Sequence, residues 1–233
     1  MRPGNGIVCG QTPFRSHGTL DTSMKINLPN QITIGRLVLA ILFFAVIAQF
    51  SIRAPSPQFW LLDVCAVIFV VAAVSDIVDG YLARKRNQVT SFGRIIDPFV
   101  DKVLICGAFA FFAGAGFLQG DRQVSHVAMW MVVLIIGREL LVTGIRGFSE
   151  ARGESFGANL YGKAKMVLQS VTAVWILLTV AHPHGFFFGG TFFVIGCEIL
   201  VWATVVVTTL SMLSYLNAAR HILSETSRPV GSA

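Results

Sequence analysis

The residues best suited to chemistry are four of the chain's twelve acidic residues, which lie within one short stretch. They follow the pattern Asp76-x-x-Asp79-Gly80-x-x-Ala83-Arg84 and then Gly93-x-x-x-Asp97-x-x-x-Asp101. Helical residues three or four apart lie on one face, so each pair of aspartates would share a face of its own helix. Two facing helices would bring four carboxylates together, where they repel one another unless protons or cations neutralise them. The spacing therefore indicates cation or proton chemistry.

Magnesium is the natural cation for such a site. It is a hard ion that accepts carboxylate oxygens and binds phosphates at its remaining positions. Two metal ions held side by side can clamp both the attacking and the leaving oxygen of a phosphoryl displacement. Four aspartates at this spacing are therefore suited to metal-assisted phosphoryl transfer.

The same stretch resembles the signature of the CDP-alcohol phosphatidyltransferases at all eight defining positions. Flanking segments are similar to the branch of that family that makes phosphatidylglycerophosphate in bacteria, and the resemblance covers roughly residues 27 to 221. These segments are Asn27-Leu28-Pro29-Asn30-Gln31-Ile32-Thr33, Arg138-Glu139 and Ser211-Met212-Leu213-Ser214-Tyr215-Leu216. The resemblance implies an enzyme that takes CDP-diacylglycerol and sn-glycerol 3-phosphate and makes phosphatidylglycerophosphate and CMP.

The resemblance also implies roles for single residues. Asp76, Asp79, Asp97 and Asp101 would bind two divalent ions, Mg²⁺ or Mn²⁺, and Asp101 would also take the proton from the acceptor hydroxyl. The predicted CDP-diacylglycerol site consists of Asn30, Thr33, Gly80, Ala83, Arg84, Thr90 and Gly93. Small side chains would let a nucleotide approach the backbone, and a planar guanidinium suits phosphate oxygens. Helix packing and membrane topology are the alternative roles for these small and basic residues.

A second group of cations could bind the acceptor. We expect its phosphate to be held by Arg138, Arg146, Lys163 and Lys165, and this cluster favours glycerol 3-phosphate over a neutral alcohol. Two alternatives stay open. Arg138 could form a structural ion pair with Glu139, and the other three could be topology signals.

Composition predicts an all-α integral membrane protein. Hydrophobic residues make up 54% of the chain and charged residues 13%, and the mean hydropathy is +0.69. An average soluble domain carries about 25% charged residues. We expect six transmembrane helices with a metal site facing the cytosol, at Ile32–Phe50, Phe59–Val78, Ile95–Leu118, Val127–Ile145, Lys165–Ala181 and Phe188–Tyr215.

The basic residues predict the orientation. Lys and Arg, Arg36 among them, gather at both chain ends and in the second and fourth loops, whereas the opposite side carries only Arg53 and Arg122. The positive-inside rule then makes both termini cytoplasmic, in what we expect to be a bacterial inner membrane. The net charge of +6 reflects this topology and attraction to anionic membrane lipids, which we expect as partners, rather than nucleic-acid binding.

We expect a membrane domain at residues 25–221 between a disordered cytosolic tail at 1–24 and a second cytosolic tail at 222–233. Pro29 should break regular helix before the first span. The family implies a homodimer. Glu198 lies within the last predicted span, and its sequence context indicates no role.

Three other interpretations stay open. The chain could belong to the same family but use inositol phosphate, serine or phosphatidylglycerol as its acceptor, because the shared motif binds the nucleotide and other residues choose the acceptor. A cation or proton transporter would need carboxylates accessible from both faces and often has an inverted repeat. The acids cluster on one side, and no repeat is visible. A scaffold protein would have no need for the acids.

Overall fold

The computed structural model describes residues 28–86, 91–151, 160–183 and 190–226, and these ranges are almost entirely helical. The six helices in this part of the chain are α1 (Leu28–Ile47), α2 (Trp60–Arg86), α3 (Ser91–Phe112), α4 (Met129–Ala151), α5 (Leu160–Ala181) and α6 (Thr191–Thr226). The all-α prediction is confirmed.

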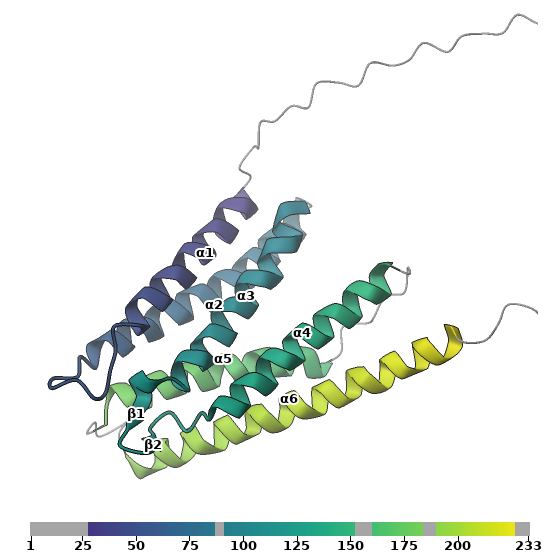
Figure 1. The fold of residues 1–233 in the computed structure, drawn as a ribbon. Coiled ribbons are helices and arrows are strands. Elements are labelled where there is room, and N and C mark those ends of the chain that lie inside the picture. The colour runs from purple at the N-terminus through teal and green to yellow at the C-terminus, as the bar shows by residue number, and fades with distance from the viewer. Residues whose placement is uncertain (1–27, 87–90, 152–159, 184–189, 227–233) are drawn as a thin grey trace, which may run out of the picture.

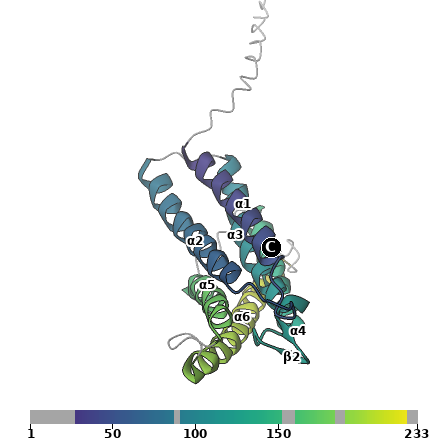
Figure 2. The same cartoon turned by 90° about the vertical axis from the view of Figure 1, so that its left-hand side faces the viewer.

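The helices alternate in direction and form two layers (Figures 1 and 2). In the first layer α1 packs against α2 and α3, and in the second α6 packs against α4 and α5. Helix α5 joins the layers through α2, and α3 also contacts α4 and α5. One end of the bundle holds the start of α1, the end of α2 and the start of α3, and we call it the motif end. The other end is the hairpin end.

The hairpin end contains the small departures from helix. Helix α3 stops at Phe112, and the chain continues through a 3-10 turn, η1 (Ala115–Phe117), into two short antiparallel strands, β1 (Leu118–Gln119) and β2 (Arg122–Gln123). The predicted third span, which continued to Leu118, is therefore too long. Arg53 fastens the hairpin by donating to the carbonyl oxygens of Leu118 and Gly120, at 2.8 and 3.0 Å.

Apolar side chains fill the interior of both layers. Phe43, Phe69, Phe109, Ile176 and Leu177 are all almost completely buried. Gly107 allows α3 to approach α1 closely, because a Cβ there would lie 2.4 Å from the Phe44 ring.

The helix ends differ from the predicted spans where polar sequence begins. Helix α1 starts at Leu28, so the prediction that Pro29 breaks the helix is wrong. Proline is tolerated in a first turn, where its missing N–H has no helical partner to lose. Helix α2 continues eight residues beyond Val78 to Arg86, so the first half of the aspartate motif is helical throughout.

The outer surface of the bundle is apolar. Among the described residues, one helical stretch is both long enough and apolar enough to cross a membrane, and it is Thr191–Asn217. Four other helices contain shorter apolar stretches. Every helix nevertheless exposes more than half of at least one large apolar side chain, as shown by Ile41, Val67, Phe99, Val133, Leu140, Val167, Phe192, Ile199 and Leu210.

Candidate active site at the motif end

The aspartate motif lies at the adjoining ends of two helices. Positions 76 and 79 lie in the last three turns of α2, and positions 97 and 101 lie in the first three turns of α3. Only residues 87–90 separate Arg86 from Ser91, so the two helix ends are at most about 18 Å apart. The predicted helical spacing is confirmed for the backbone of both pairs.

Several predicted contacts fall outside the described side chains. Thr90 lies in a segment that is outside the described residues. The side chains outside the described set are those of Asn30, Thr33, Asp76, Asp79, Gly80, Ala83, Arg84, Gly93, Asp97, Asp101 and Lys163. Among the described side chains, no group of three or more His, Cys, Asp or Glu residues could hold a metal ion.

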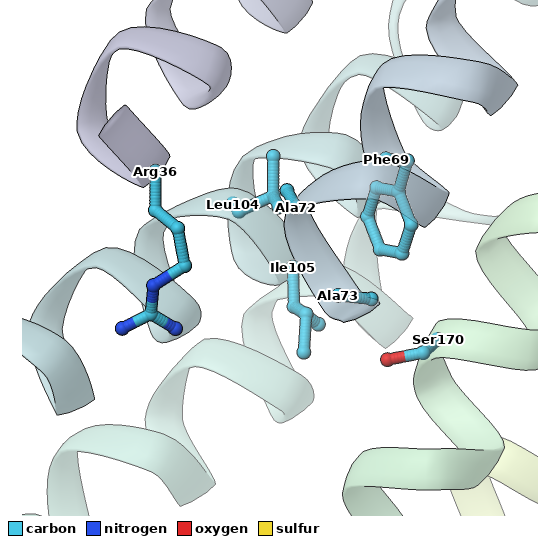
Figure 3. A pocket seen from close by; sticks show the side chains of 7 residues that line it. All are labelled: Arg36, Phe69, Ala72, Ala73, Leu104, Ile105 and Ser170. Carbon is cyan, nitrogen blue, oxygen red and sulfur yellow. The ribbon is translucent and has the colours of Figure 1, made fainter. Parts of the chain in front are cut away.

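A small internal cavity of about 20 Å³ lies one helical turn below the motif (Figure 3). Ala72 and Ala73 line it from the turn of α2 before position 76, and Leu104 and Ile105 line it from the turn of α3 after position 101. Phe69, Arg36 and Ser170 complete the lining. The helical turns next to the two halves of the motif therefore line one pocket.

Arg36 is a buried residue of this region that sequence reasoning missed. Its basic character led to an assignment as a topology signal, yet only 3% of the residue is exposed. It comes from α1, which packs against both motif helices. Its position well inside the apolar segment was the signal that could have identified it, because a buried cation in a span is usually functional.

The predicted acceptor cations form a second cluster between α4, α5 and α6. Arg138 and Lys165 are 4% and 3% exposed, and both contact the carboxylate of Glu139. The Nη1 of Arg138 lies 3.0 Å from the Oε1 of Glu139, and the Nζ of Lys165 contacts the same oxygen. The ion pair that the sequence left open is therefore present, and Lys165 joins it.

Two side chains of α6 hold the guanidinium groups of α4. Arg138 donates from Nη2 to the hydroxyl of Ser211 at 2.6 Å. Arg146 donates from Nη2 to the hydroxyl of Tyr215, also at 2.6 Å, and lies 5.4 Å from the centre of the Tyr215 ring. Arg138 lies 5.6 Å from the same ring, so Tyr215 contacts both cations.

The cluster therefore brings together three of the four predicted cations, Arg138, Arg146 and Lys165. Three cations and one carboxylate leave a formal charge of +2 among these described side chains. Ser211 and Tyr215 were part of the resembling segment but were not predicted site residues. Ser211 and Tyr215 are four residues apart, so they lie on one face of the helix, and this spacing could have identified them as neighbours.

A hydrogen-bonded connection links this cluster to the motif helix. Lys102, the residue after position 101, donates to the hydroxyl of Thr143 at 2.5 Å. That hydroxyl donates to the carbonyl oxygen of Glu139 at 2.7 Å. Helix α3, which carries the second half of the aspartate motif, is thus tied to the cation-bearing helix α4.

Comparisons with known proteins point to one family. The family model described as CDP-alcohol phosphatidyltransferase matches residues 26–219. A Bacillus subtilis protein named CDP-diacylglycerol–glycerol-3-phosphate 3-phosphatidyltransferase is 35% identical over 157 residues, 65% of this chain and 77% of its own length. A Salmonella typhimurium protein of the same name is 32% identical over 205 residues, 84% of this chain and 97% of its own length. A Yersinia enterocolitica protein, also of that name, is 32% identical over 208 residues, 87% of this chain and its full length.

Proposed function

The chain belongs to the CDP-alcohol phosphatidyltransferase family, and we propose that it transfers the phosphatidyl group from CDP-diacylglycerol to sn-glycerol 3-phosphate. The acceptor oxygen forms a bond to the phosphorus that carries diacylglycerol. The bond from that phosphorus to the CMP oxygen breaks, and CMP leaves with the electron pair. The products are phosphatidylglycerophosphate and CMP.

The acceptor assignment depends chiefly on the cations of the second cluster. Among the described side chains, Arg138, Arg146 and Lys165 come together between α4, α5 and α6, and Arg138 and Lys165 are buried. A concentration of cations in a poorly solvated site favours an anionic ligand. A phosphate suits it, because guanidinium groups are well shaped for phosphate oxygens. An acceptor without a phosphate would make less use of these cations.

The motif aspartates fit a pair of divalent ions by the chemistry of their donors. Carboxylate oxygens are the ligands that Mg²⁺ and Mn²⁺ prefer, and Asp76, Asp79, Asp97 and Asp101 would hold the ions between α2 and α3. When bound, the ions would neutralise the pyrophosphate and make the acceptor hydroxyl more acidic. Asp101 would take the hydroxyl proton. Positioning and charge neutralisation dominate phosphoryl transfer, so these side chains carry most of the proposed catalysis.

The CDP-lipid would bind along the motif helices and the start of α1. Arg84 would hold a phosphate oxygen, and Gly80 and Ala83 would let the nucleotide approach the helix backbone. The other proposed contacts are Asn30, Thr33, Thr90 and Gly93. Lys163, on the first turn of α5, remains a proposed acceptor contact beside Lys165.

We place all six helices across a membrane, with the motif end and both termini in the cytosol. Helices of 20 to 36 residues are long enough to span about 30 Å of hydrocarbon. Large apolar side chains exposed on all six would be costly in water but suit lipid tails. We propose a bacterial inner (plasma) membrane, because the relatives come from bacteria, and we retain a homodimer as part of this proposal.

The test is a purified-enzyme assay with CDP-diacylglycerol and Mg²⁺, offered glycerol 3-phosphate, inositol phosphate, serine and phosphatidylglycerol in separate reactions. We expect CMP release and a new phospholipid mainly with glycerol 3-phosphate. A preference for another acceptor would overturn the acceptor assignment alone. Failure with every acceptor, in a folded protein, would overturn phosphatidyl transfer itself.

A further inference from the structure

Helices α5 and α6 carry a row of buried polar side chains where they face each other. The hydroxyls of Thr172 and Thr204 lie 2.9 Å apart and form the first pair. The two helices run in opposite directions, so moving back along α5 and forward along α6 leads toward the motif end (Figure 1). Residues three or four apart stay on the same face, and this spacing defines the next pairs.

The second pair consists of Gln169 on α5 and Thr208 on α6, and the third consists of Lys165 and Ser211. With a helical rise of 1.5 Å per residue, the members of the second pair lie about 4.5 and 6 Å from the first pair along the bundle. The members of the third pair both lie about 10.5 Å away. Members of each pair are therefore at nearly the same depth. We call the three pairs the polar ladder.

The middle pair differs from its neighbours in hydrogen bonding. In the first pair the two threonines bond each other, and in the third Ser211 accepts from Arg138 and Lys165 contacts Glu139. Gln169 and Thr208 are 1% and 0% exposed. Within the part of the chain that the structure describes, the Nε2 of Gln169 and the Oγ1 of Thr208 have no hydrogen-bond partner.

Arg138 supplies a third such group, beside Ser211 in the neighbouring pair. Its Nη2 bonds Ser211, one turn from Thr208 on α6, while its Nε has no hydrogen-bond partner among the described residues. The Nε–H and an Nη2–H of a guanidinium lie on the same edge of its planar fork. The Nε–H of Arg138 therefore lies next to the nitrogen that bonds Ser211, one turn along α6 from Thr208.

A buried polar group without a partner loses its hydrogen bonds to water, so a ligand atom that satisfies all three groups has a large advantage. Two of them are N–H donors and the third is a hydroxyl that can donate or accept. The matching ligand atom is an oxygen that accepts hydrogen bonds. A hydroxyl oxygen fits, because its own proton can go to a neighbouring acceptor.

We propose that Gln169 and Thr208, with the Nε–H of Arg138, bind the second hydroxyl of the polyol acceptor. This inference rests on the proposed function. Glycerol 3-phosphate has two hydroxyls, one of which attacks phosphorus, and the other enters a buried site where it needs partners. The phosphate binds beside Lys165 and Arg146, one turn or more nearer the motif end. The middle pair of the ladder thus sets the preference for a polyol phosphate.

The test compares glycerol 3-phosphate with 3-hydroxypropyl phosphate, which keeps the phosphate and a terminal hydroxyl and lacks only the middle hydroxyl. We expect the wild-type enzyme to prefer glycerol 3-phosphate by about 100-fold or more in kcat/KM, because the analogue leaves buried groups unsatisfied. In Gln169→Leu and Thr208→Val the preference should fall to below about tenfold. The loss should come from slower use of glycerol 3-phosphate.

Thr204→Val is the matched control, one turn away on the same helix. It removes a hydroxyl that bonds Thr172, so it should lower the unfolding temperature and leave the substrate preference unchanged. Thr208→Val should leave the unfolding temperature unchanged or raised, because no partner is lost. The hydroxyl site is refuted if the wild type uses both substrates equally. It is also refuted if Gln169→Leu and Thr208→Val both keep the preference for glycerol 3-phosphate. A wild type that does not use glycerol 3-phosphate at all refutes the proposed function instead.

Discussion

Glu139 is the side chain whose removal best tests the acceptor site. Its carboxylate contacts both Arg138 and Lys165, and its side chain is 12% exposed. Glu139→Gln keeps the volume but removes the carboxylate that both buried cations contact. Breaking a buried pair costs about 3 to 5 kcal/mol, and partial exposure favours the lower value. At about 2 to 4 °C per kcal/mol, the unfolding temperature should fall by about 6 to 12 °C.

The same substitution should strengthen phosphate binding. Two unit charges about 6 Å apart interact by about 3 kcal/mol at an effective dielectric constant near 20, so Glu139 repels an anion in the cluster by that amount. If desolvation offsets half of this gain, the affinity for glycerol 3-phosphate rises about tenfold. Added glycerol 3-phosphate should therefore restore more stability to Glu139→Gln than it adds to the wild type.

The assay is thermal unfolding of purified protein in detergent over a range of glycerol 3-phosphate concentrations. Asp63→Asn is the control, since Asp63 pairs with His182 at 3.0 Å near the hairpin end and both side chains are about 40% exposed. An exposed pair contributes about 0 to 1 kcal/mol, so this variant should resemble the wild type. The reasoning is refuted if Glu139→Gln unfolds at the wild-type temperature, or if glycerol 3-phosphate stabilises both proteins equally.

Two further predictions concern the proposed metal ligands and the hydrogen bond between Arg146 and the hydroxyl of Tyr215. Asparagine at any one of the four motif positions, Asp76, Asp79, Asp97 and Asp101, should reduce transfer by at least about 100-fold without preventing membrane insertion. A chelator should abolish wild-type activity until Mg²⁺ or Mn²⁺ is restored. Full activity in chelator would exclude the two-metal site. Tyr215→Phe removes the hydroxyl that accepts from Arg146 but keeps the ring, so KM for glycerol 3-phosphate should rise about tenfold or more with little change in KM for the CDP-lipid. Equal changes in both KM values would show that Tyr215 acts on the fold rather than on the acceptor.

The sequence predicted the helices better than their ends. Apolar runs identify the six helical segments because only an α-helix satisfies its own backbone over such a length. The runs do not show where a helix stops once the sequence becomes polar. Helix α2 therefore continues to Arg86, and α6 extends eleven residues beyond Tyr215 to Thr226.

The second cluster could not be assembled from sequence spacing. Arg138 and Ser211 are 73 residues apart, and Arg146 and Tyr215 are 69 apart. No local pattern relates residues on separate helices at such distances. Arg36 was explained by membrane topology alone, and topology was the open alternative for Lys165, because basic residues beside a span usually have that role. Their burial depends on the packing of neighbouring helices, which the pattern of one helix does not contain.

The two layers divide the proposed reaction between them. The motif that would bind the nucleotide and metals lies on α2 and α3, whereas the described cations and the polar ladder lie on α4, α5 and α6. Residues in the second layer can therefore change without altering the motif. The hydrogen bonds from Lys102 to Thr143 and from Thr143 to the backbone of Glu139 hold α3 and α4 together, and with them the motif and the cation cluster. Such a division explains physically how one nucleotide motif can serve several acceptors, because the acceptor contacts a different set of helices.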